Sequence, residues 1–396
     1  MGFVIVGGGA TGITAASTLR SLDKTIEISI YSEEKISYYP RSGLIDFLKS
    51  KLDNTNPSFY SDRWYADHKI SLFSGEPVIA LHPEKKQIVA EGGKSVSYDR
   101  LLLATGARPA VPEIPGRELN GIFTFRTIED AGRIRGFASG CQNAVIIGGG
   151  LLGLETAAAI KESVQSVTVV ERSERLVPRQ LDTAAASTLF DILKEKGIDM
   201  ILSSEPREFA GDEKVKSVIL DDGATLQTQM AIICTGIQPS IELASTAGLN
   251  CNQGVIVDEY LKTSASDVYA AGDVAEFHGL VYGTAQAATE QARIAARNML
   301  LSRSARYSGS IFQNNLKIPG IHLLAVGISV SPDGEAKEKI SSDNKKKTYE
   351  KIVVRRGRIV GAIVLGLQEH ESYITDLVTK HATVKEYNAG THNNDF

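Results

Sequence analysis

A strand-type apolar run followed by a cluster of glycines opens the chain. Residues 3–6 are apolar throughout. They lead into three glycines in G-x-G-x-x-G spacing, Gly7, Gly9 and Gly12, and residues 13–22 then carry apolar side chains at helical intervals. The pattern predicts a strand, a tight turn and the start of a helix.

This turn suits a dinucleotide, because glycine lets a pyrophosphate approach the free N–H groups at a helix N-terminus. A second apolar strand, residues 26–31, is followed by Glu33 and Glu34, where a carboxylate would accept hydrogen bonds from a ribose. A glycine-rich turn alone also serves ordinary sheet packing. The strand before it, the helix after it and the acid at the expected distance together favour a bound dinucleotide.

The same arrangement occurs a second time. Residues 144–147 form an apolar run. The run leads into Gly148, Gly150 and Gly153, a helical pattern follows, and the next predicted strand ends at Glu171. Two such units in one chain predict two dinucleotide sites.

The two units also end in equivalent segments, which we call their exits. Each ends in a strand followed by Thr-Gly and a proline: ATGARP contains Thr105 and Gly106, and CTGIQP contains Gly236. The chain then returns through a further strand to a glycine turn that carries Asp273, and a helix follows at 284–300. Since this last segment repeats strand, turn and helix, the second unit is predicted to be inserted within the first.

The predicted fold class is therefore α/β, with two Rossmann-type dinucleotide-binding domains, one inserted in the other, and a small C-terminal α+β domain. The expected boundaries are 1–111 and 240–312 for the first domain, 112–239 for the second and 313–396 for the C-terminal domain.

Composition excludes several classes of protein but does not identify the function. Of 396 residues, 42% are hydrophobic and 23% charged, and the net charge of −4 argues against a nucleic-acid binder. No apolar run approaches a membrane span, and the first strand begins too early for a signal peptide, so a cytoplasmic protein is expected. The cysteines, Cys141, Cys234 and Cys251, lack C-x-x-C and metal-ligand spacing, so neither a metal site nor thiol chemistry is predicted.

Taken in order, the segments GGGATG, ATGARPAVPEIPG, GGGLLGLE, CTGIQP, TSASDVYAAGDVAE and LKIPGI resemble the FAD-dependent pyridine nucleotide oxidoreductases. Within that family the chain is most similar to NADH:rubredoxin oxidoreductases and to the flavin portion of nitrite reductase large subunits. The resemblance covers essentially the whole chain. It implies FAD in the first unit and NADH in the second.

The resemblance also implies which residues contact FAD. They are Gly7, Gly9, Thr11 and Gly12 at the pyrophosphate, Glu33 at the adenosine ribose, Val78 near the adenine, Arg41, Thr105 and Gly106 along the cofactor, Asp273 at the ribityl hydroxyls and Thr284 at a helix N-terminus facing the flavin pyrimidine. A helix N-terminus would stabilise the negative charge of reduced flavin.

The nicotinamide cofactor would be bound by Gly148, Gly150, Leu152, Gly153, Glu155, Glu171 and Gly236, with Glu155 near the carboxamide. A carboxylate at Glu171 suits a free 2′-hydroxyl and repels a 2′-phosphate, which favours NADH over NADPH. Arg172 and Arg175 follow closely, either as counter-charges for a phosphate or as solvated charges at a helix entry.

Departures from the family pattern bear on the chemistry. Many relatives keep a redox cysteine or cysteine pair in the segment that is YYPRSGL here. This chain has Arg41 and Ser42 at that place and no cysteine before Cys141, so hydride taken from NADH is expected to leave the flavin without thiol chemistry. Dioxygenase-type ferredoxin reductases have a lysine about where Asp46 stands, so the resemblance to them is incomplete.

The expected function is transfer of electrons from NADH through FAD to a small one-electron carrier protein such as rubredoxin or ferredoxin. The alternatives are an NADH oxidase that uses oxygen, an electron-input subunit of a nitrite reductase type system, and a non-enzymatic nucleotide-bound redox sensor. No nucleic-acid or membrane partner is expected, and the protein would be a monomer or homodimer. Lys345, Lys346 and Lys347 form a candidate docking site for an acidic carrier, although a solvated loop is the favoured interpretation of this polar run.

Overall fold

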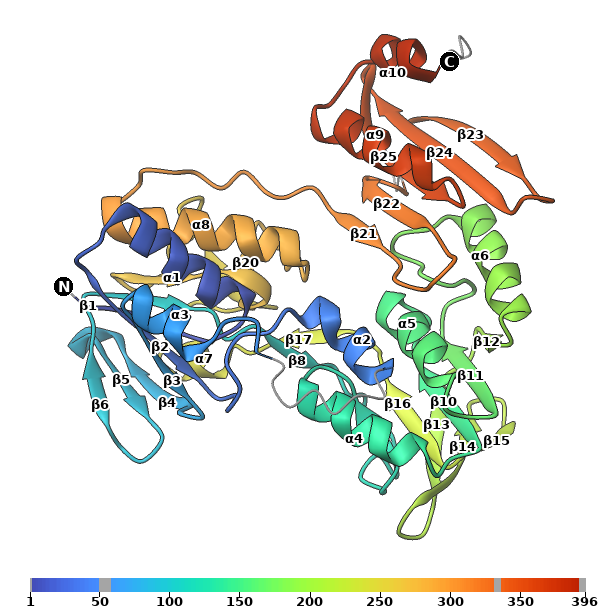
Figure 1. Ribbon diagram of the computed structural model, residues 1–396, viewed down its shortest axis with the longest axis horizontal. Helices are drawn as coiled ribbons and strands as arrows, with labels where there is room; N and C mark the ends of the chain where they lie inside the picture. The colour runs from blue at the N-terminus through green and yellow to red at the C-terminus, as the bar shows by residue number, and fades with distance from the viewer. Residues whose placement is uncertain (1, 50–57, 331–335, 392–396) are drawn as a thin grey trace. The chain divides into compact units, whose positions relative to one another are not determined.

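The structure, a computed structural model, describes residues 2–49, 58–330 and 336–391, and the last part of the predicted C-terminal domain, residues 392–396, lies outside them. The chain divides into two compact units, and most of their elements are labelled in Figure 1. The described residues of unit 1 are 2–43, 58–108 and 237–310, and those of unit 2 are 44–49, 109–236, 311–330 and 336–391.

Unit 1 consists of a parallel sheet, its covering helices and an antiparallel meander. Its elements are β1 (Gly2–Val6), α1 (Ala10–Leu22), β2 (Glu27–Ser32), the 3-10 turn η1 (Arg41–Gly43), α3 (Asp62–Asp67), β3 (Ile70–Ser74), β4 (Val78–His82), the 3-10 turn η2 (Pro83–Lys85), β5 (Gln87–Ala90), β6 (Ser95–Ser97), β7 (Arg100–Leu103), α7 (Glu242–Thr246), β18 (Val255–Val257), β19 (Val268–Ala270), the 3-10 turn η3 (Gly272–Val274), β20 (Ala275–Phe277) and α8 (Ala285–Leu301). Two short strands, β8 (Ala107–Pro109) and β17 (Ile237–Pro239), form a separate two-stranded sheet.

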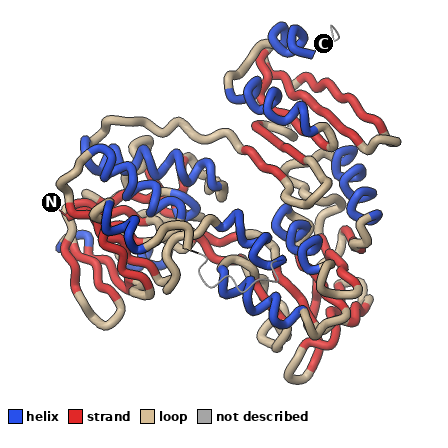
Figure 2. Tube along the Cα trace, viewed as in Figure 1, coloured by secondary structure: helices blue, strands red, loops and turns tan. Residues whose placement is uncertain are grey.

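The five strands of the parallel sheet lie in the order β19-β7-β1-β2-β3. Helices α1 and α8 lie side by side over it, as Figure 2 shows. Because both faces of a parallel sheet are covered, its strands are nearly continuous apolar runs, and Ile5 and Leu102 are fully buried. Strand β19 pairs with β7 but follows residue 236 in the sequence. All strands of the second Rossmann-type sheet therefore lie, in sequence, between strands of the first sheet.

Unit 2 combines a second parallel sheet with a C-terminal antiparallel sheet. Its elements are α2 (Leu44–Lys49), β9 (Ile122–Thr124), α4 (Ile128–Ala138), β10 (Asn143–Ile147), α5 (Leu151–Ile160), β11 (Ser166–Glu171), α6 (Thr183–Glu195), β12 (Asp199–Leu202), β13 (Pro206–Gly211), β14 (Val215–Leu220), β15 (Thr225–Gln227), β16 (Met230–Ile233), β21 (Gln313–Asn315), β22 (Leu323–Gly327), β23 (Lys337–Asp343), β24 (Thr348–Arg355), β25 (Arg358–Leu365), α9 (Gln368–Thr379) and α10 (Val384–Thr391). The parallel sheet has the order β12-β11-β10-β16-β9 and the C-terminal sheet the order β21-β22-β25-β24-β23.

These sheets confirm the predicted fold class: two Rossmann-type sheets and a C-terminal domain built on an antiparallel sheet. Strand β23 and helix α10 were not predicted. The sequence of β23, KEKISSD, is polar because β23 is an edge strand, where charged side chains discourage pairing with another chain.

A buried lysine connects the C-terminal sheet to the second Rossmann-type domain within unit 2. The side chain of Lys351, on β24, is 3% exposed, and its Nζ lies 3.1 Å from Asp182 Oδ2 and 2.7 Å from Glu338 Oε1. Tyr349 OH donates to the same Asp182 oxygen at 2.7 Å. Asp182 also accepts from Ala185 N at the start of α6. Burial opposes ionisation of Asp182, but these donors outweigh it and hold the pKa of its carboxyl below the ordinary value.

Replacing this lysine should therefore destabilise unit 2. Lys351→Met should lower the free energy of unfolding by roughly 3 kcal/mol, because two carboxylates lose the cation between them. The midpoint of urea unfolding, followed by circular dichroism, measures the change. Lys380→Met is the matched control, since the Lys380–Asp376 ion pair is exposed on α9 and should contribute less than about 0.5 kcal/mol. Equal effects of the two changes would contradict a stabilising role for the buried cluster.

Candidate functional site

Three glycines bring the predicted FAD segments of unit 1 into direct contact. A Cβ added to Gly12 would lie 2.0 Å from Gly7 O, and one added to Gly7 would lie 2.0 Å from Ala104 O. A Cβ on Gly272 would lie 2.2 Å from Thr11 Oγ1. The first glycine turn, the end of β7 and the turn before Asp273 therefore meet, and no side chain larger than hydrogen fits at these three positions.

The other side of the same turn is open. A Cβ on Gly9 would meet no atom of the described chain within 4 Å, and Gly9, the N-cap of α1, has no side chain to bind the free N–H groups of the helix. Gly150 has the same two properties at the start of α5. Each turn is thus closely packed against its strand and open at a helix N-terminus, and this shape fits a pyrophosphate.

The two predicted exits make equivalent hydrogen bonds. Thr105 Oγ1 donates to Ser240 O at 2.9 Å, and Gly106 adopts a left-handed φ of 69°. Thr235 Oγ1 donates to Ala110 O at 2.5 Å, and Gly236 adopts a φ of 118°. The glycines allow both strands to end in conformations that other residues rarely adopt.

Arg41 lies at the centre of a charged cluster in unit 1. Its Nη2 is 2.6 Å from Glu34 Oε1, and its Nη1 donates to Tyr39 OH at 3.3 Å. Tyr39 OH donates in turn to the second oxygen of Glu34. Burial opposes the charge of Arg41, but attraction to Glu34, Tyr39 and Asp273 outweighs it and raises the pKa of Arg41. The structure thus places a cation in the electrostatic range of Asp273, and neighbouring Ser42 is exposed.

The acids that follow β2 and β11 differ in position. Glu171 is the last residue of β11 and is 7% exposed; its two carboxylate oxygens accept from Gly149 N at 2.6 Å and from Ser173 N at 2.8 Å. In unit 1 the corresponding side chain beside the glycine turn is Ser32, close to Gly8, and Glu33 is one residue further and exposed. Backbone amides therefore fix the carboxylate beside the second turn, whereas a serine lies at the equivalent place beside the first turn.

Glu155, on α5, receives a hydrogen bond that the sequence did not predict. Lys317 N, in the LKIPGI segment, donates to Glu155 Oε1 at 2.8 Å. Burial raises the pKa of Glu155, Asp46 raises it further, and Lys317 and Lys49 act in the opposite direction. The lysine that dioxygenase-type relatives place at Asp46 is absent here, but Lys49, one turn later on α2, supplies a positive charge near Glu155. No local pattern in the sequence marks this contact, since the two residues are 162 positions apart.

Other predicted contacts lie at helix and strand ends. Thr284 is the N-cap of α8, and its side chain accepts from Ala287 N at 3.3 Å. Leu152, in the first turn of α5, is 39% exposed, which is unusual for a large apolar residue on a mostly buried helix. Val78 begins β4 and is half-buried.

The chain belongs to the pyridine nucleotide-disulphide oxidoreductase family. The profile described as "Pyridine nucleotide-disulphide oxidoreductase" matches residues 1–292, and that described as "Rubredoxin NAD+ reductase C-terminal domain" matches residues 313–382. These matches confirm the family resemblance, and the family implies use of FAD and a nicotinamide nucleotide.

Three similar proteins cover nearly the whole chain. The present chain is 30% identical over 384 residues to "Nitrite reductase [NAD(P)H]" of Bacillus subtilis. This alignment covers 97% of the present chain but only 48% of the relative. The chain is 28% identical over 379 residues to "Rubredoxin-NAD(+) reductase" of Pseudomonas putida, covering 94% of this chain and 97% of the relative. The reductase in a covalent putidaredoxin reductase–putidaredoxin complex superposes with a TM-score of 0.88 at 25% identity, covering 96% of this chain and 93% of that one. The chain spans about half the length of the first of these relatives.

Although the family is named for disulphides, the cysteines of this member are poorly suited to thiol chemistry. Burial raises the pKa of Cys234 to about 12, and it raises the pKa of Cys141 and Cys251 as well. A neutral thiol is a poor nucleophile. No cluster of three potential metal ligands occurs among the described residues, and no helix within them is long and apolar enough to cross a bilayer.

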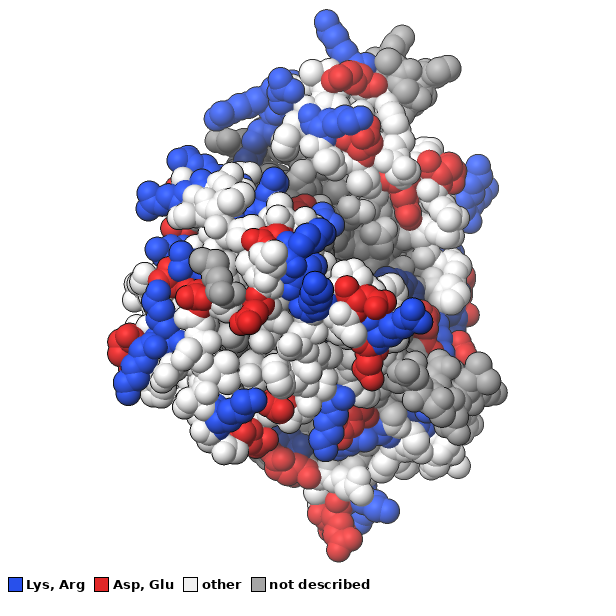
Figure 3. Space-filling view, turned by 60° about the vertical axis from the view of Figure 1, so that its left-hand side comes forward, with Lys and Arg blue, Asp and Glu red and all other residues white. Residues whose placement is uncertain are grey.

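The lysines at 345–347 are not equally exposed. Lys347 forms an ion pair with Glu195 and is only 26% exposed at its side chain, so the interpretation of all three lysines as a solvated loop is wrong for Lys347. Lys345 and Lys346 are exposed. On the face shown in Figure 3, basic and acidic side chains are interspersed.

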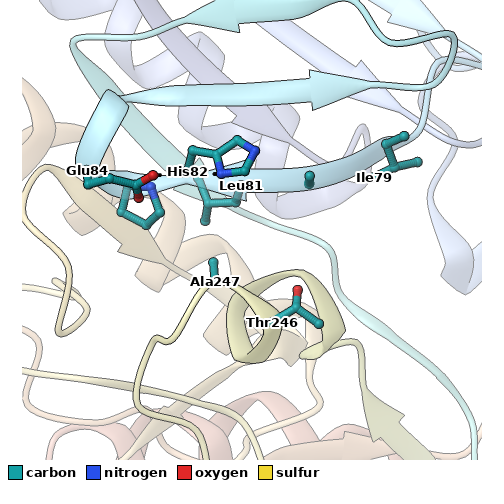
Figure 4. A pocket seen from close by; sticks show the side chains of 8 residues that line it. Ile79, Leu81, His82, Glu84, Thr246 and Ala247 are labelled. Carbon is teal, nitrogen blue, oxygen red and sulfur yellow. Dashed lines mark ion pairs between the residues drawn. The ribbon is translucent and has the colours of Figure 1, made fainter.

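A hollow of about 380 Å³ lies in unit 1 between β4 and α7 (Figure 4). His82 Nδ1 lies 3.8 Å from Glu84 Oε1 on one side of the hollow, and Thr246 and Ala247 line the opposite side. None of the lining residues is among the predicted cofactor contacts, so we assign the hollow no part in the site.

Burial of Glu155 predicts a pH-dependent stability. The folded protein binds the Glu155 proton more tightly than the unfolded chain, so this group's contribution to stability is lost as pH rises from the ordinary value of 4.5 through the folded-state pKa. Glu155→Gln keeps an acceptor for Lys317 N–H and removes the charge. The variant should therefore melt at a higher temperature than the parent at about pH 8, with a smaller difference at about pH 5.

Calorimetry at the two pH values measures this difference. Glu162→Gln, at an exposed position just after α5, is the control and should leave the melting temperature unchanged at both. A Glu155→Gln effect that is the same at both pH values would contradict the assignment.

Proposed function

We propose that this protein takes hydride from NADH and passes electrons to a small one-electron carrier protein, with FAD bound in unit 1 and NADH bound in unit 2. The observation that carries the proposal is the pair of glycine turns, each closed against its own strand and open at a helix N-terminus. The whole-length similarity to a protein named rubredoxin-NAD(+) reductase supports a carrier of that class.

The FAD-binding domain would comprise residues 1–111 and 240–312, and the NADH-binding domain residues 112–239. FAD would be held by the first glycine turn, Arg41, the exit at Thr105 and Gly106, Asp273 and the N-terminus of α8, as the contacts among these segments favour. When bound, FAD would supply acceptance of a hydride and release of single electrons.

The residues of unit 2 would orient the nicotinamide nucleotide. Glycine turn 148–153 would bind its pyrophosphate, and exposed Leu152 would contact the dinucleotide. Each Glu171 oxygen uses one lone pair for a backbone amide and keeps another for a ribose hydroxyl. Since all three thiols are held neutral, no cysteine of this chain would relay the electrons.

Parallel assays test this function. The purified protein should show flavin absorbance, NADH should bleach it, and steady-state turnover should be faster with rubredoxin or ferredoxin than with oxygen. Faster turnover with oxygen would instead indicate an NADH oxidase. Bound FAD without turnover by any acceptor would indicate a redox sensor, and a protein that does not bind added FAD would overturn the proposal.

Coenzyme preference should depend on Glu171. Glu171→Ala removes the buried carboxylate and leaves exposed Arg172 beside the site, so the Kd for NADH should rise about tenfold and the preference should move toward NADPH. Stopped-flow flavin reduction with each nucleotide measures both effects. Glu174→Gln, whose side chain is 75% exposed and paired with Arg175, should leave the preference unchanged. Tighter binding of NADPH than of NADH by the parent protein would show that Glu171 does not select the coenzyme.

A further inference from the structure

A buried glutamine on α8 binds the turn that precedes Asp273. Gln291 is 1% exposed, and its Oε1 accepts from Gly272 N at 2.7 Å. Its Nε2 donates to Tyr307 OH at 3.2 Å. Both ends of the amide thus have a partner, which fixes its orientation. Neither Gln291 nor Tyr307 was singled out from the sequence.

The hydrogen bonds continue from Tyr307 to an acid on the same helix. Tyr307 OH and Ser310 Oγ lie 2.7 Å apart, and Ser310 Oγ donates to Glu290 Oε2. Because the serine proton is used for the carboxylate, the tyrosine must donate to the serine. Burial raises the pKa of Tyr307 to about 12, so its hydroxyl keeps the proton that it donates. Gln286 Nε2 donates to the other oxygen of Glu290 at 3.1 Å.

All donors in this series of hydrogen bonds therefore point toward Glu290. The series runs from Gln291 through Tyr307 and Ser310 on one side and from Gln286 on the other. Hydrogen bonds aligned in one direction polarise and strengthen one another. We call these five residues the α8 chain. Its members lie in unit 1, and Ser310 is the last residue of that unit.

The α8 chain ends at two segments of the proposed FAD site. At one end, Gly272 has a φ of 82° and packs against Thr11 too closely to carry a Cβ, and its N–H donates to Gln291 Oε1. Asp273 follows directly. At the other end, Gln286 lies in the first turn of α8, after the N-cap Thr284.

We propose that Gln291, Tyr307, Ser310 and Glu290 are positioning residues that fix the peptide before Asp273 against the first turn of α8 and thereby set the affinity for FAD. The inference rests on the proposed FAD site. It extends that site to residues 307–310, which are distant in sequence from every glycine motif.

Removing one hydroxyl tests the proposal. Tyr307→Phe interrupts the hydrogen bonds of the α8 chain and leaves a buried amide donor without its acceptor. The Kd of the apoprotein for FAD should therefore rise about tenfold. Tyr269→Phe is the matched control: Tyr269 is 5% exposed, and its hydroxyl donates to Asn298 O at 3.0 Å, near the other end of α8. Both variants should lower the melting temperature of the apoprotein, but only Tyr307→Phe should weaken FAD binding.

A second variant tests whether the residues of the α8 chain act together on the affinity for FAD. Ser310→Ala, at a half-buried position, should raise the Kd for FAD in the same direction, and the double variant with Tyr307→Phe should bind no more weakly than Tyr307→Phe alone. Additive effects, or equal Kd values for Tyr307→Phe and Tyr269→Phe, would overturn the proposal. Failure of the parent protein to bind FAD would overturn the proposed function instead, so the two outcomes are distinguishable.

Discussion

Both proposed nucleotide sites depend on one steric constraint, which is that a helix begins directly against the turn before it. A Cβ on Gly12 would lie 2.0 Å from Gly7 O, and a Cβ on Gly153 would lie 1.9 Å from Gly148 O. This close approach fixes where each helix starts, and a Cβ added to the N-cap glycine, Gly9 or Gly150, would meet no described atom within 4 Å. Because the N-caps of both helices are glycines without a side-chain acceptor, the first N–H groups of each helix need an external partner. The backbone alone thus offers an anion site at each turn, and in the proposed function the side chains would decide which dinucleotide binds there.

Those side chains make the two sites unequal. In unit 2 a buried carboxylate, Glu171, is bound to the glycine turn itself through Gly149 N, so negative charge is present before any ligand arrives. In unit 1 the place beside the turn belongs to Ser32, and the fixed charges are those of Arg41 and Glu34 nearby. A carboxylate held in this way is suited to ribose hydroxyls and opposes an additional phosphate. The difference in charge supports different nucleotides for two turns of nearly the same shape.

The sequence was sufficient for features that depend on local pattern and insufficient for those that depend on distant partners. Apolar runs and glycine spacing predicted both parallel sheets and the inserted order, since these signals lie within a few residues of one another. The bonds between Tyr349 and Asp182 and between Lys317 and Glu155 join residues 167 and 162 positions apart. Nothing local marks either partner, because a polar residue bound to a distant one has the same sequence context as a solvated one. For the same reason Gln291 could not be told apart from other polar residues of a helix.

The charges around Arg41 bear on how electrons can leave this protein. Relatives with a redox cysteine in this segment need a thiolate, which a neighbouring cation would stabilise. Here the cation itself occupies the segment, its charge is largely committed to Glu34, and the three thiols of the chain are elsewhere and held neutral by burial. In the proposed function, no cysteine of this chain would then store electrons between donor and acceptor. An acceptor would approach the cofactor itself, and access to the cofactor would decide between a carrier protein and a small molecule.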